Sequence, residues 1–413
     1  MKIMNKNWFF TSILLVTCGT CLLLWHFVTY FRQKSRTIKI GIIHSLTGDL
    51  AISERPVVDA TMLAITEINK AGGVLGKHIE PIIIDGKSDE AVFAAEAERL
   101  ITEKKVVALF GCWTSQCRIA VKNVVEKHNN LLFYPVQFEG FEDSPNVVYT
   151  STTPNQQVIP GVVWCLKNLG KSFFLVGSDL MLHQLIKDVL SAYNGKVVGE
   201  EYLALENKNI SPIITKIIAT KPDVILNNIE GETNILFFTE LRKQGITPEK
   251  IPTMSFSISE PELQLFQTNA MTGDYATWSY FQNIKNQENK DFVQKIKNTY
   301  GKDRVTSDEM ESGYCGVYFW SQAVTKAQST KTDLVRKALK NQYFNAPEGM
   351  IYINENSQHT CLFVRVGKIR SDKQFNILWS SQKAVRPLSY PPFRSIAEWN
   401  NLLIELKQKE SEQ

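Results

Sequence analysis

The sequence lacks a strong charge imbalance and a cluster of basic residues. Lys and Arg total 46 against 42 Asp and Glu in 413 residues, which gives a formal net charge of +4, and the two signs are interspersed. A protein that binds nucleic acid is expected to gather its basic residues into a patch or stripe. The composition therefore predicts no nucleic-acid partner.

The cysteines and histidines lack the spacing of a metal site. Two of the seven cysteines, Cys18 and Cys21, lie in an apolar N-terminal segment. We expect the other cysteines to be buried as small hydrophobic residues, because they form an odd and scattered set rather than a disulfide framework. They are Cys112, Cys117, Cys165, Cys315 and Cys361. The six histidines are equally dispersed, so the sequence predicts no metal and no other cofactor.

Enzyme motifs are missing or incomplete. The glycines from Gly72 to Gly76 follow a predicted helix and precede a predicted strand, which is the reverse of a phosphate-binding loop. Ser380 and Lys383 have the Ser-x-x-Lys spacing of some acyl-transfer enzymes but lack the companion motifs. We therefore expect a protein that is not an enzyme.

The N-terminal segment differs from the rest of the chain. Trp8–Tyr30 is apolar and free of formal charge for roughly 23 residues, enough to cross a hydrocarbon core of about 30 Å. The core of a cleavable signal is shorter, so residues 1–36 are expected to be a membrane anchor or an uncleaved signal, with lipidation at Cys18 as an alternative. The anchor would hold the protein on the periplasmic or extracytoplasmic face of the plasma membrane. The basic residues that follow Tyr30 argue the other way under the positive-inside rule.

From Thr37 onward, short apolar strands alternate with amphipathic helices. Strands are predicted at 38–43, 79–84, 106–110 and 131–134, and the same alternation restarts after residues 150–155. Continuous apolar strands between amphipathic helices are typical of a parallel sheet covered on both faces. Because the chain is long for one core, we expect an α/β fold with two lobes, each a mostly parallel sheet flanked by helices, and a cleft between them.

The chain is expected to pass between the lobes three times and so to form a three-segment hinge. The predicted crossings lie near residues 150–155, 277–284 and 345–352. The predicted boundaries are 1–36 for the anchor, 37–152 plus 281–345 for lobe 1, 153–280 plus 346–400 for lobe 2, and 401–413 for a C-terminal tail.

Several motifs in one order carry a resemblance to a known family. They are Ile40–Gly48, Glu67–Lys77, the segments around Trp113 and Tyr134, Pro154–Gln157, Gly177–Asp179, Asp303–Ser307, Asn345–Gly349 and Arg386–Pro387. From Ile38 to about Trp399 the chain resembles the urea and short-chain amide binding proteins of ABC transporters. These are type I periplasmic binding proteins related to the branched-chain amino acid binders.

The resemblance implies a function as well as a fold. It implies a two-lobed type I periplasmic binding protein, or Venus-flytrap, that is exported, captures a small polar ligand of the urea or short-chain amide class, and works with ABC permease subunits. A sensory module of the same fold, coupled to a membrane signalling partner, is the alternative, since fold does not fix function.

Ligands of open α/β sheets bind at the carboxyl ends of the strands. In lobe 1, the predicted strand ends carry Trp113, Thr114, Ser115, Tyr134 and Gln137. A planar amide offers N–H donors and one carbonyl, so hydroxyls and an amide oxygen between aromatic walls would suit it. We expect these residues to contact the ligand.

Lobe 2 is expected to contribute Asp179, Leu180 and Glu230 from its own strand ends. Here the chain departs from its resemblance, because relatives that bind urea or amides carry a tyrosine where this chain has Leu180 and usually a neutral residue where it has Glu230. Leu180 offers no hydrogen bond, and Glu230 adds a carboxylate. The departure predicts either a ligand other than urea or weakened binding.

Overall fold

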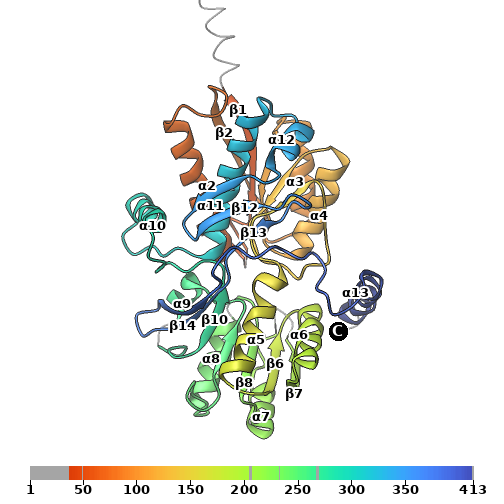
Figure 1. Ribbon diagram of the computed structural model, residues 1–413, viewed down its shortest axis with the longest axis vertical. Coiled ribbons are helices and arrows are strands. Elements are labelled where there is room, and N and C mark those ends of the chain that lie inside the picture. The colour runs from red at the N-terminus through yellow and green to blue at the C-terminus, as the bar shows by residue number, and fades with distance from the viewer. Residues whose placement is uncertain (1–36, 49, 204–206, 232, 267–268, 412–413) are drawn as a thin grey trace, which may run out of the picture.

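The computed structural model describes residues 37–411 except 49, 204–206, 232 and 267–268. Figure 1 shows two units, one above the other, each built on a sheet with helices packed against it. The predicted α/β fold with two lobes of mostly parallel sheet is confirmed. The expected anchor, Trp8–Tyr30, lies outside the described residues. Among the helices that are described, none is long and apolar enough to span a membrane.

The first unit is built on a parallel sheet. Its strands are β1 (Thr37–His44), β2 (His78–Asp85), β3 (Leu109–Gly111), β4 (Leu132–Tyr134) and β5 (Val147–Tyr149), in the order β2-β1-β3-β4-β5. Its helices are α2 (Ala51–Lys70), α3 (Glu90–Thr102), α4 (Ser115–Lys127), α10 (Gln287–Tyr300), α11 (Asp308–Ala327) and α12 (Thr332–Leu339). An antiparallel sheet of β11 (Tyr343–Ala346), β12 (Gly349–Ile353) and β13 (Thr360–Cys361) joins this unit beside α11.

The second unit follows the same plan with an antiparallel edge. Its strands are β6 (Ser172–Gly177), β7 (Lys196–Tyr202), β8 (Val224–Asn228), β9 (Thr253–Ser255), β10 (Tyr275–Trp278), β14 (Arg365–Ile369) and β15 (Phe375–Ser380). They run in the order β15-β14-β10-β9-β8-β6-β7, and β14 and β15 are the antiparallel ones. Its helices are α5 (Val158–Asn168), α6 (Leu180–Ala192), α7 (Ser211–Thr220), α8 (Thr233–Lys243), α9 (Glu260–Leu265) and α13 (Ile396–Ser411), and the short helix η1 (Pro154–Gln156) lies in the segment that leads into this unit.

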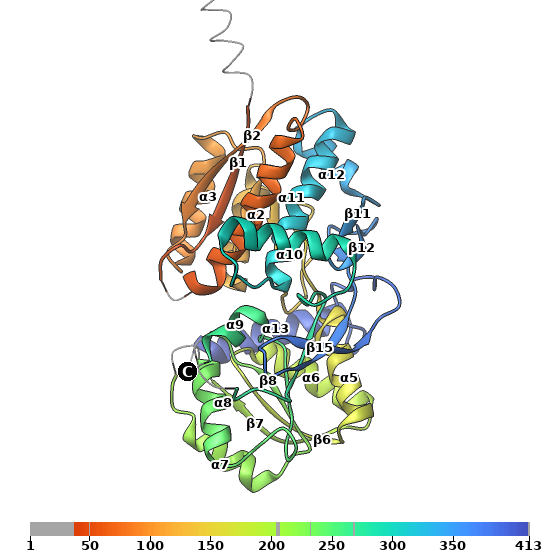
Figure 2. The same ribbon diagram turned by 90° about the vertical axis from the view of Figure 1, so that its left-hand side faces the viewer.

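Successive strand residues fill cores on opposite faces of each sheet. In β6, Phe173 and Leu175 pack in one core with residues of α5 and α6, whereas Phe174 and Val176 pack in another with residues of α7 and α8. In the first unit, α2 and α11 cover one face and α3 and α4 the other (Figure 2). Because both faces are covered, central strands such as β6 and β8 are largely apolar, and their polar groups lie at the strand ends.

Within the described residues, the chain crosses between the units at three places. The first two, 150–157 and 279–286, overlap the predicted crossings. The third differs, because β13 still pairs with β12 in the first unit while β14 pairs with β10 in the second. The chain therefore crosses at 362–364 rather than near 345–352, and residues 346–361 belong with the first unit.

The misplaced crossing has a local cause. Pro347 and Glu348 form the two-residue turn between β11 and β12, in which Ala346 pairs with Gly349. Proline and glycine are typical of tight turns and of linkers alike, so a hairpin and an inter-lobe linker look the same in sequence at this point.

The C-terminal end is a helix up to Ser411 rather than the predicted tail of residues 401–413. Ser395 and Glu398 form a capping box, since each side chain accepts a hydrogen bond from the other residue's backbone N–H. Trp399 is fully buried, with its ring 4.6 Å from that of Phe141. The capping box and the buried indole of Trp399 together hold α13 beside the second unit, as Figure 1 shows.

A buried carboxylate ties the first two crossing segments together. Asp308, at the start of α11, accepts a hydrogen bond from Ser151 Oγ in the first crossing at 2.9 Å. It also accepts from the backbone N–H groups of Ser279 and Tyr280 in the second crossing, at 3.0 Å and 2.9 Å. Arg365, just after the third crossing, donates to the Ser279 carbonyl. The three crossing segments are therefore held at one point against α11.

We predict that Asp308→Ala lowers the free energy of unfolding by about 2 to 6 kcal/mol, because two buried backbone N–H groups lose their acceptor at about 1 to 3 kcal/mol each. Asp308→Asn is the matched control. It keeps an oxygen for both N–H groups and an amide that donates to Ser151, so its loss should be less than half as large. Calorimetric unfolding measures both, and equal losses would show that the charge rather than the acceptor geometry matters.

Candidate functional site

The carboxyl ends of the strands in the two units face each other. In the first unit β1 lies between β2 and β3, and in the second β6 lies between β7 and β8, so each sheet reverses its order there. Ligands bind beside such reversals in α/β proteins. Glu139, which follows β4, and Glu230, which follows β8, are close enough for their charges to interact. We call the residues at these ends the inter-unit site: Trp113, Thr114, Ser115, Tyr134, Gln137, Glu139, Asp179, Leu180 and Glu230.

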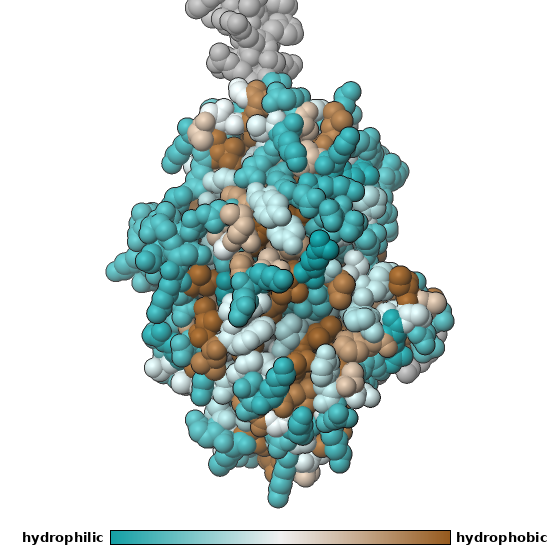
Figure 3. Space-filling view, in the orientation of Figure 1, coloured by the Kyte–Doolittle hydropathy of each residue, from teal (hydrophilic) through white to brown (hydrophobic). Residues whose placement is uncertain are grey.

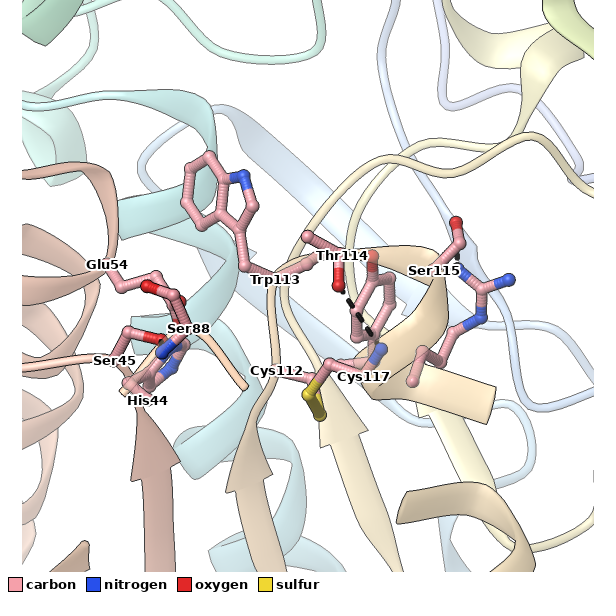
Figure 4. The surroundings of a disulfide bond; sticks show 11 residues. His44, Ser45, Glu54, Ser88, Cys112, Trp113, Thr114, Ser115 and Cys117 are labelled. Atoms are coloured by element: carbon pink, nitrogen blue, oxygen red, sulfur yellow. Dashed lines mark hydrogen bonds and ion pairs between the residues drawn. A yellow bond between two sulfur atoms is a disulfide. The ribbon is translucent and has the colours of Figure 1, made fainter. Parts of the chain in front are cut away.

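A disulfide closes the loop between β3 and α4. Cys112 and Cys117 are both buried, as expected, but they are joined, with their Cα atoms 5.7 Å apart, so the expectation that these cysteines form no disulfide is wrong. The other described cysteines are free and buried, as expected. The chain bends sharply at Cys112, whose φ of 69° lies in the left-handed region, and this bend is not visible in the sequence. The cross-link restrains the loop that carries Trp113 and Thr114 (Figure 4).

The two residues inside this loop point in different directions. Figure 4 shows the indole of Trp113 extending beyond the strand ends, and this side chain is partly exposed. The Thr114 hydroxyl instead caps α4, accepting a hydrogen bond from Cys117 N at 3.2 Å. Tyr134 is 1% exposed and its hydroxyl donates to the Trp113 carbonyl at 2.6 Å. Tyr134 therefore acts on the inter-unit site by supporting Trp113.

Ser115 belongs to a buried charged network. Its hydroxyl donates to Glu139 at 2.6 Å and accepts from Arg118 at 3.0 Å. The Arg118 guanidinium is 1% exposed and also donates to Glu139 at 3.0 Å and to Glu142 at 3.2 Å. Lys122 contacts Glu142 as well, at 2.7 Å. The charges of the first unit are thus largely paired with one another, and the hydroxyl of Ser115 is held in one orientation.

Gln137, which follows β4, carries an acceptor that is not satisfied within the described residues. Its side-chain oxygen is buried and finds no hydrogen-bond partner among the described residues. A buried polar atom without a partner is costly unless a ligand or water satisfies it. Gln137 is therefore placed to receive an N–H group.

The second unit brings its predicted residues together at one edge. The register pairs Gly177 of β6 with Asn228 of β8, and Asp179 and Glu230 each lie two residues beyond that pair. Residues two apart on an extended chain project to the same side, so the two carboxylates are neighbours. Asp179 Oδ1 also caps α6 by accepting from Leu182 N at 2.9 Å. Leu180 is partly exposed at the first position of α6.

Glu230 has an unusual electrostatic setting. Its partial burial, followed by the negative charges of Asp179 and Glu139, raises the pKa of this carboxyl group to about 7. Burial and like charges both disfavour the ionised form, so the shift has the sign that the geometry demands. Glu230 therefore changes charge within the physiological pH range.

Three site-forming residues were missed in the sequence, namely Arg118, Glu139 and Glu142. The two glutamates lie 21 and 24 positions after Arg118 along the chain. A weak signal was present, since Arg118 falls on the otherwise apolar face of α4 beside Cys117, Val121 and Val125. A charged residue on a buried face needs a partner, and the nearby Glu139 and Glu142 follow the adjacent strand.

We predict that Arg118→Met lowers the free energy of unfolding by about 3 to 5 kcal/mol, because removing one partner leaves buried carboxylates uncompensated. Lys122→Met is the control, since its side chain is 20% exposed and pairs with Glu142 only at the edge of the network. Its loss should stay below about 1 kcal/mol, as for surface ion pairs. Calorimetric unfolding of both variants distinguishes a structural network from two ordinary ion pairs.

Comparison with known proteins places the chain in a family. The family model described as a periplasmic binding protein domain matches residues 38–396. The Leu/Ile/Val-binding protein homolog 7 of Brucella suis is 22% identical over 74% of this chain and 81% of its own length. A solved solute-binding protein of an ABC transporter from Rhodopseudomonas palustris BisB5, in complex with 3,4-dihydroxybenzoic acid, superimposes with a TM-score of 0.78 at 21% identity, covering 85% of this chain and 99% of that one.

A shorter match has a different name. A protein called limonene hydroxylase from Geobacillus stearothermophilus is 37% identical over 113 residues, which is 27% of this chain. The match spans only 21% of that relative's length. The relatives matched over most of their length are binding proteins. The family whose model matches residues 38–396 is described as periplasmic, which indicates an extracytoplasmic location. The match across residues 38–396 shows that this chain belongs to the periplasmic binding protein family, of type I and related to the Leu/Ile/Val-binding proteins.

Proposed function

We propose that this protein captures a small polar ligand between its two units and presents it to the permease of an ABC transporter. The ligand proposed is of the urea or short-chain amide class. Closure of the units around the ligand would create the state that a permease recognises, because a ligand that contacts both units favours the closed arrangement.

The observation that carries this proposal is the set of acceptors at the inter-unit site. Gln137 from the first unit offers an oxygen without a partner among the described residues, and Glu230 from the second unit carries a carboxylate whose pKa responds to the charge of Glu139 in the first. Glu139 and Asp179 add further carboxylates. Urea and short amides are rich in N–H donors, so such acceptors suit them.

The same acceptors argue against the ligands of some relatives. The Rhodopseudomonas palustris protein was solved with 3,4-dihydroxybenzoic acid, and a Streptococcus pneumoniae relative with isoleucine. A benzoate carboxylate would meet Glu230 and Asp179, and the nearby guanidinium of Arg118 is already engaged by Glu139 and Glu142. Like charges at short range are repulsive, so an anionic ligand is disfavoured.

We also propose that Trp8–Tyr30 tethers the protein to the outer face of the membrane. Its apolar length supports an anchor. The Cys112–Cys117 disulfide fits an oxidising compartment, where such bonds persist. Mass spectrometry of the mature protein tests the tether, because cleavage after Tyr30 or at Cys18 would remove it.

The ligand class is tested by calorimetry on the full-length protein. The panel is urea, formamide, acetamide, isoleucine and 4-hydroxybenzoate. We expect at least one of urea, formamide and acetamide to bind, and to bind more tightly than isoleucine and 4-hydroxybenzoate. Tighter binding of either carboxylate-bearing compound would refute the proposed ligand class.

We predict that Leu180→Tyr strengthens urea or acetamide binding by about 0.5 to 1.5 kcal/mol, the net value of one added hydrogen bond. The control is Leu236→Tyr, because Leu236 lies in α8 of the same unit and is 41% exposed. The affinity ratio of parent to variant is measured for each. A ratio near one for both would place Leu180 outside the binding site.

A further inference from the structure

Asn228 carries a buried amide nitrogen without a partner. Asn228 is the last residue of β8 and is 6% exposed. Its Nδ2 atom finds no hydrogen-bond partner among the described residues, and neither does the buried hydroxyl of Ser178. The two residues are neighbours, since the Ser178 N–H donates to the Asn228 carbonyl at 3.5 Å. Buried polar groups normally find partners, so two adjacent ones that do not indicate a place where a polar molecule binds.

These groups lie where the order of the second sheet reverses. The register pairs Gly177 with Asn228 at the carboxyl ends of β6 and β8, and β7 lies on the other side of β6. From β6 the chain continues to β7 on one side, and from β8 it continues to β9 on the other, an arrangement that opens a crevice for ligands in α/β proteins. A Cβ atom at Gly177 would lie 1.4 Å from Asn228 Oδ1, so the amide lies directly over this glycine.

His183 fixes the orientation of the Asn228 amide. Its Nδ1 atom lies 3.1 Å from a carboxylate oxygen of Glu200, and its Nε2 atom lies 3.1 Å from Asn228 Oδ1. The hydrogen bond from His183, assisted by one from Lys187, lowers the pKa of Glu200 to about 2, so this carboxylate stays ionised and only accepts. Because the partners of both ring nitrogens are acceptors, both nitrogens donate. The side-chain oxygen of Asn228 is thereby tied to His183.

The amide nitrogen of Asn228 is consequently directed toward the strand ends. His183 lies about one turn into α6, farther from these ends than Leu180, which occupies the first position of the helix. Since the oxygen of the planar amide points to the His183 ring, the nitrogen points away from that ring. Leu180 has no polar side-chain atom, so the donor that this edge offers comes from Asn228.

We infer that Asn228 binds the ligand by donating a hydrogen bond from Nδ2 to its carbonyl oxygen, and that His183 is the positioning residue for this amide. The hydroxyl of Ser178 can donate to the same oxygen, which has two lone pairs. This inference rests on the proposed function and deepens it by orienting the ligand. The carbonyl oxygen binds to the second unit, which leaves the N–H groups for acceptors such as Gln137 in the first.

The test compares acetamide with acetamidinium by calorimetry on the full-length protein at pH 6. The two molecules have the same planar shape, but acetamidinium has N–H donors where acetamide has its carbonyl oxygen. Glu230 is mainly uncharged at this pH, because burial raises its pKa to about 7, so its charge does not favour the cation. The parent protein should bind acetamide at least tenfold more tightly, because a donor cannot pair with Asn228 Nδ2. Urea and guanidinium form a second pair with the same difference.

Asn228→Asp replaces the amide nitrogen by an acceptor and keeps an oxygen for His183. It should weaken acetamide binding at least tenfold and strengthen acetamidinium binding at least tenfold, so that the ratio of the two affinities falls at least a hundredfold. Asn168→Asp is the matched control, because the exposed amide of Asn168 at the end of α5 donates to the Trp164 carbonyl. The control should leave the ratio unchanged.

The positioning role of His183 has its own readout. In His183→Leu the Asn228 amide is free to turn and can present either its oxygen or its nitrogen to the ligand, so the ratio should fall at least threefold. A loss of stability alone would weaken the binding of both probes alike and leave the ratio as it is. An unchanged ratio in this variant would therefore overturn the positioning role of His183.

The outcomes separate this inference from the proposed function. If the parent protein binds acetamide and Asn228→Asp leaves the ratio unchanged, the contact with Asn228 is overturned and the urea and amide class still stands. Failure of urea, formamide and acetamide to bind the parent protein would overturn both. If Asn228→Asp does not fold, the parent protein decides, since acetamidinium bound as tightly as acetamide would overturn the donor role of Asn228.

Discussion

The arrangement of the two units depends on one buried carboxylate. Asp308 begins α11, a helix packed in the core of the first unit, and accepts hydrogen bonds from the first and second crossing segments. Backbone groups at the crossing cannot use a sheet ladder, because the strands on either side belong to different sheets. A side-chain acceptor must therefore satisfy them. Asp308, together with the contact of Arg365 with the Ser279 carbonyl, therefore holds the crossing segments against α11.

The two faces of the inter-unit site differ in how their charges are treated. On the first unit, Arg118 is enclosed by Glu139 and Glu142, and its guanidinium lies over the rings of Tyr134 and Phe138 at 5.2 Å and 4.6 Å. That face is rigid and internally compensated. On the second unit, burial, together with the charge of the nearby Asp179, raises the pKa of the Glu230 carboxyl group to about 7. On the face shown in Figure 3, hydrophobic residues gather near the waist and down the middle of the second unit, while hydrophilic residues line the flanks of both units.

The fold could be predicted from patterns of neighbouring residues in the sequence. The contacts of the candidate site could not, because they join residues that are far apart along the chain. The apolar run of β6 and its helical neighbours identified a covered parallel strand, and strand ends located Trp113 and Asp179 without any structure. Charge pairing could not be read in this way, because Arg118 and Glu142 are 24 residues apart and meet only after β4 packs beside β3. The Cys112–Cys117 disulfide was missed because it depends on a backbone bend that the sequence does not reveal. The hairpin at Pro347 was missed because its residues are also typical of a linker. The polar composition of the C-terminal segment predicted a tail. The segment is a helix instead, because Ser395 caps it and Trp399 is buried against the second unit.

Recognition and closure are linked through the same carboxylates. Glu139 belongs to one unit and Asp179 and Glu230 to the other, so bringing the units together brings like charges together. In a partly desolvated site this repulsion is stronger than in water. Without a ligand it opposes closure, and a ligand whose N–H groups pair with acceptors of both units would offset the opposition. A ligand shifts a conformational equilibrium only by its difference in affinity for the two states. Acceptors divided between the two units supply that difference directly, whereas acceptors confined to one unit would bind the same ligand equally well with the units apart.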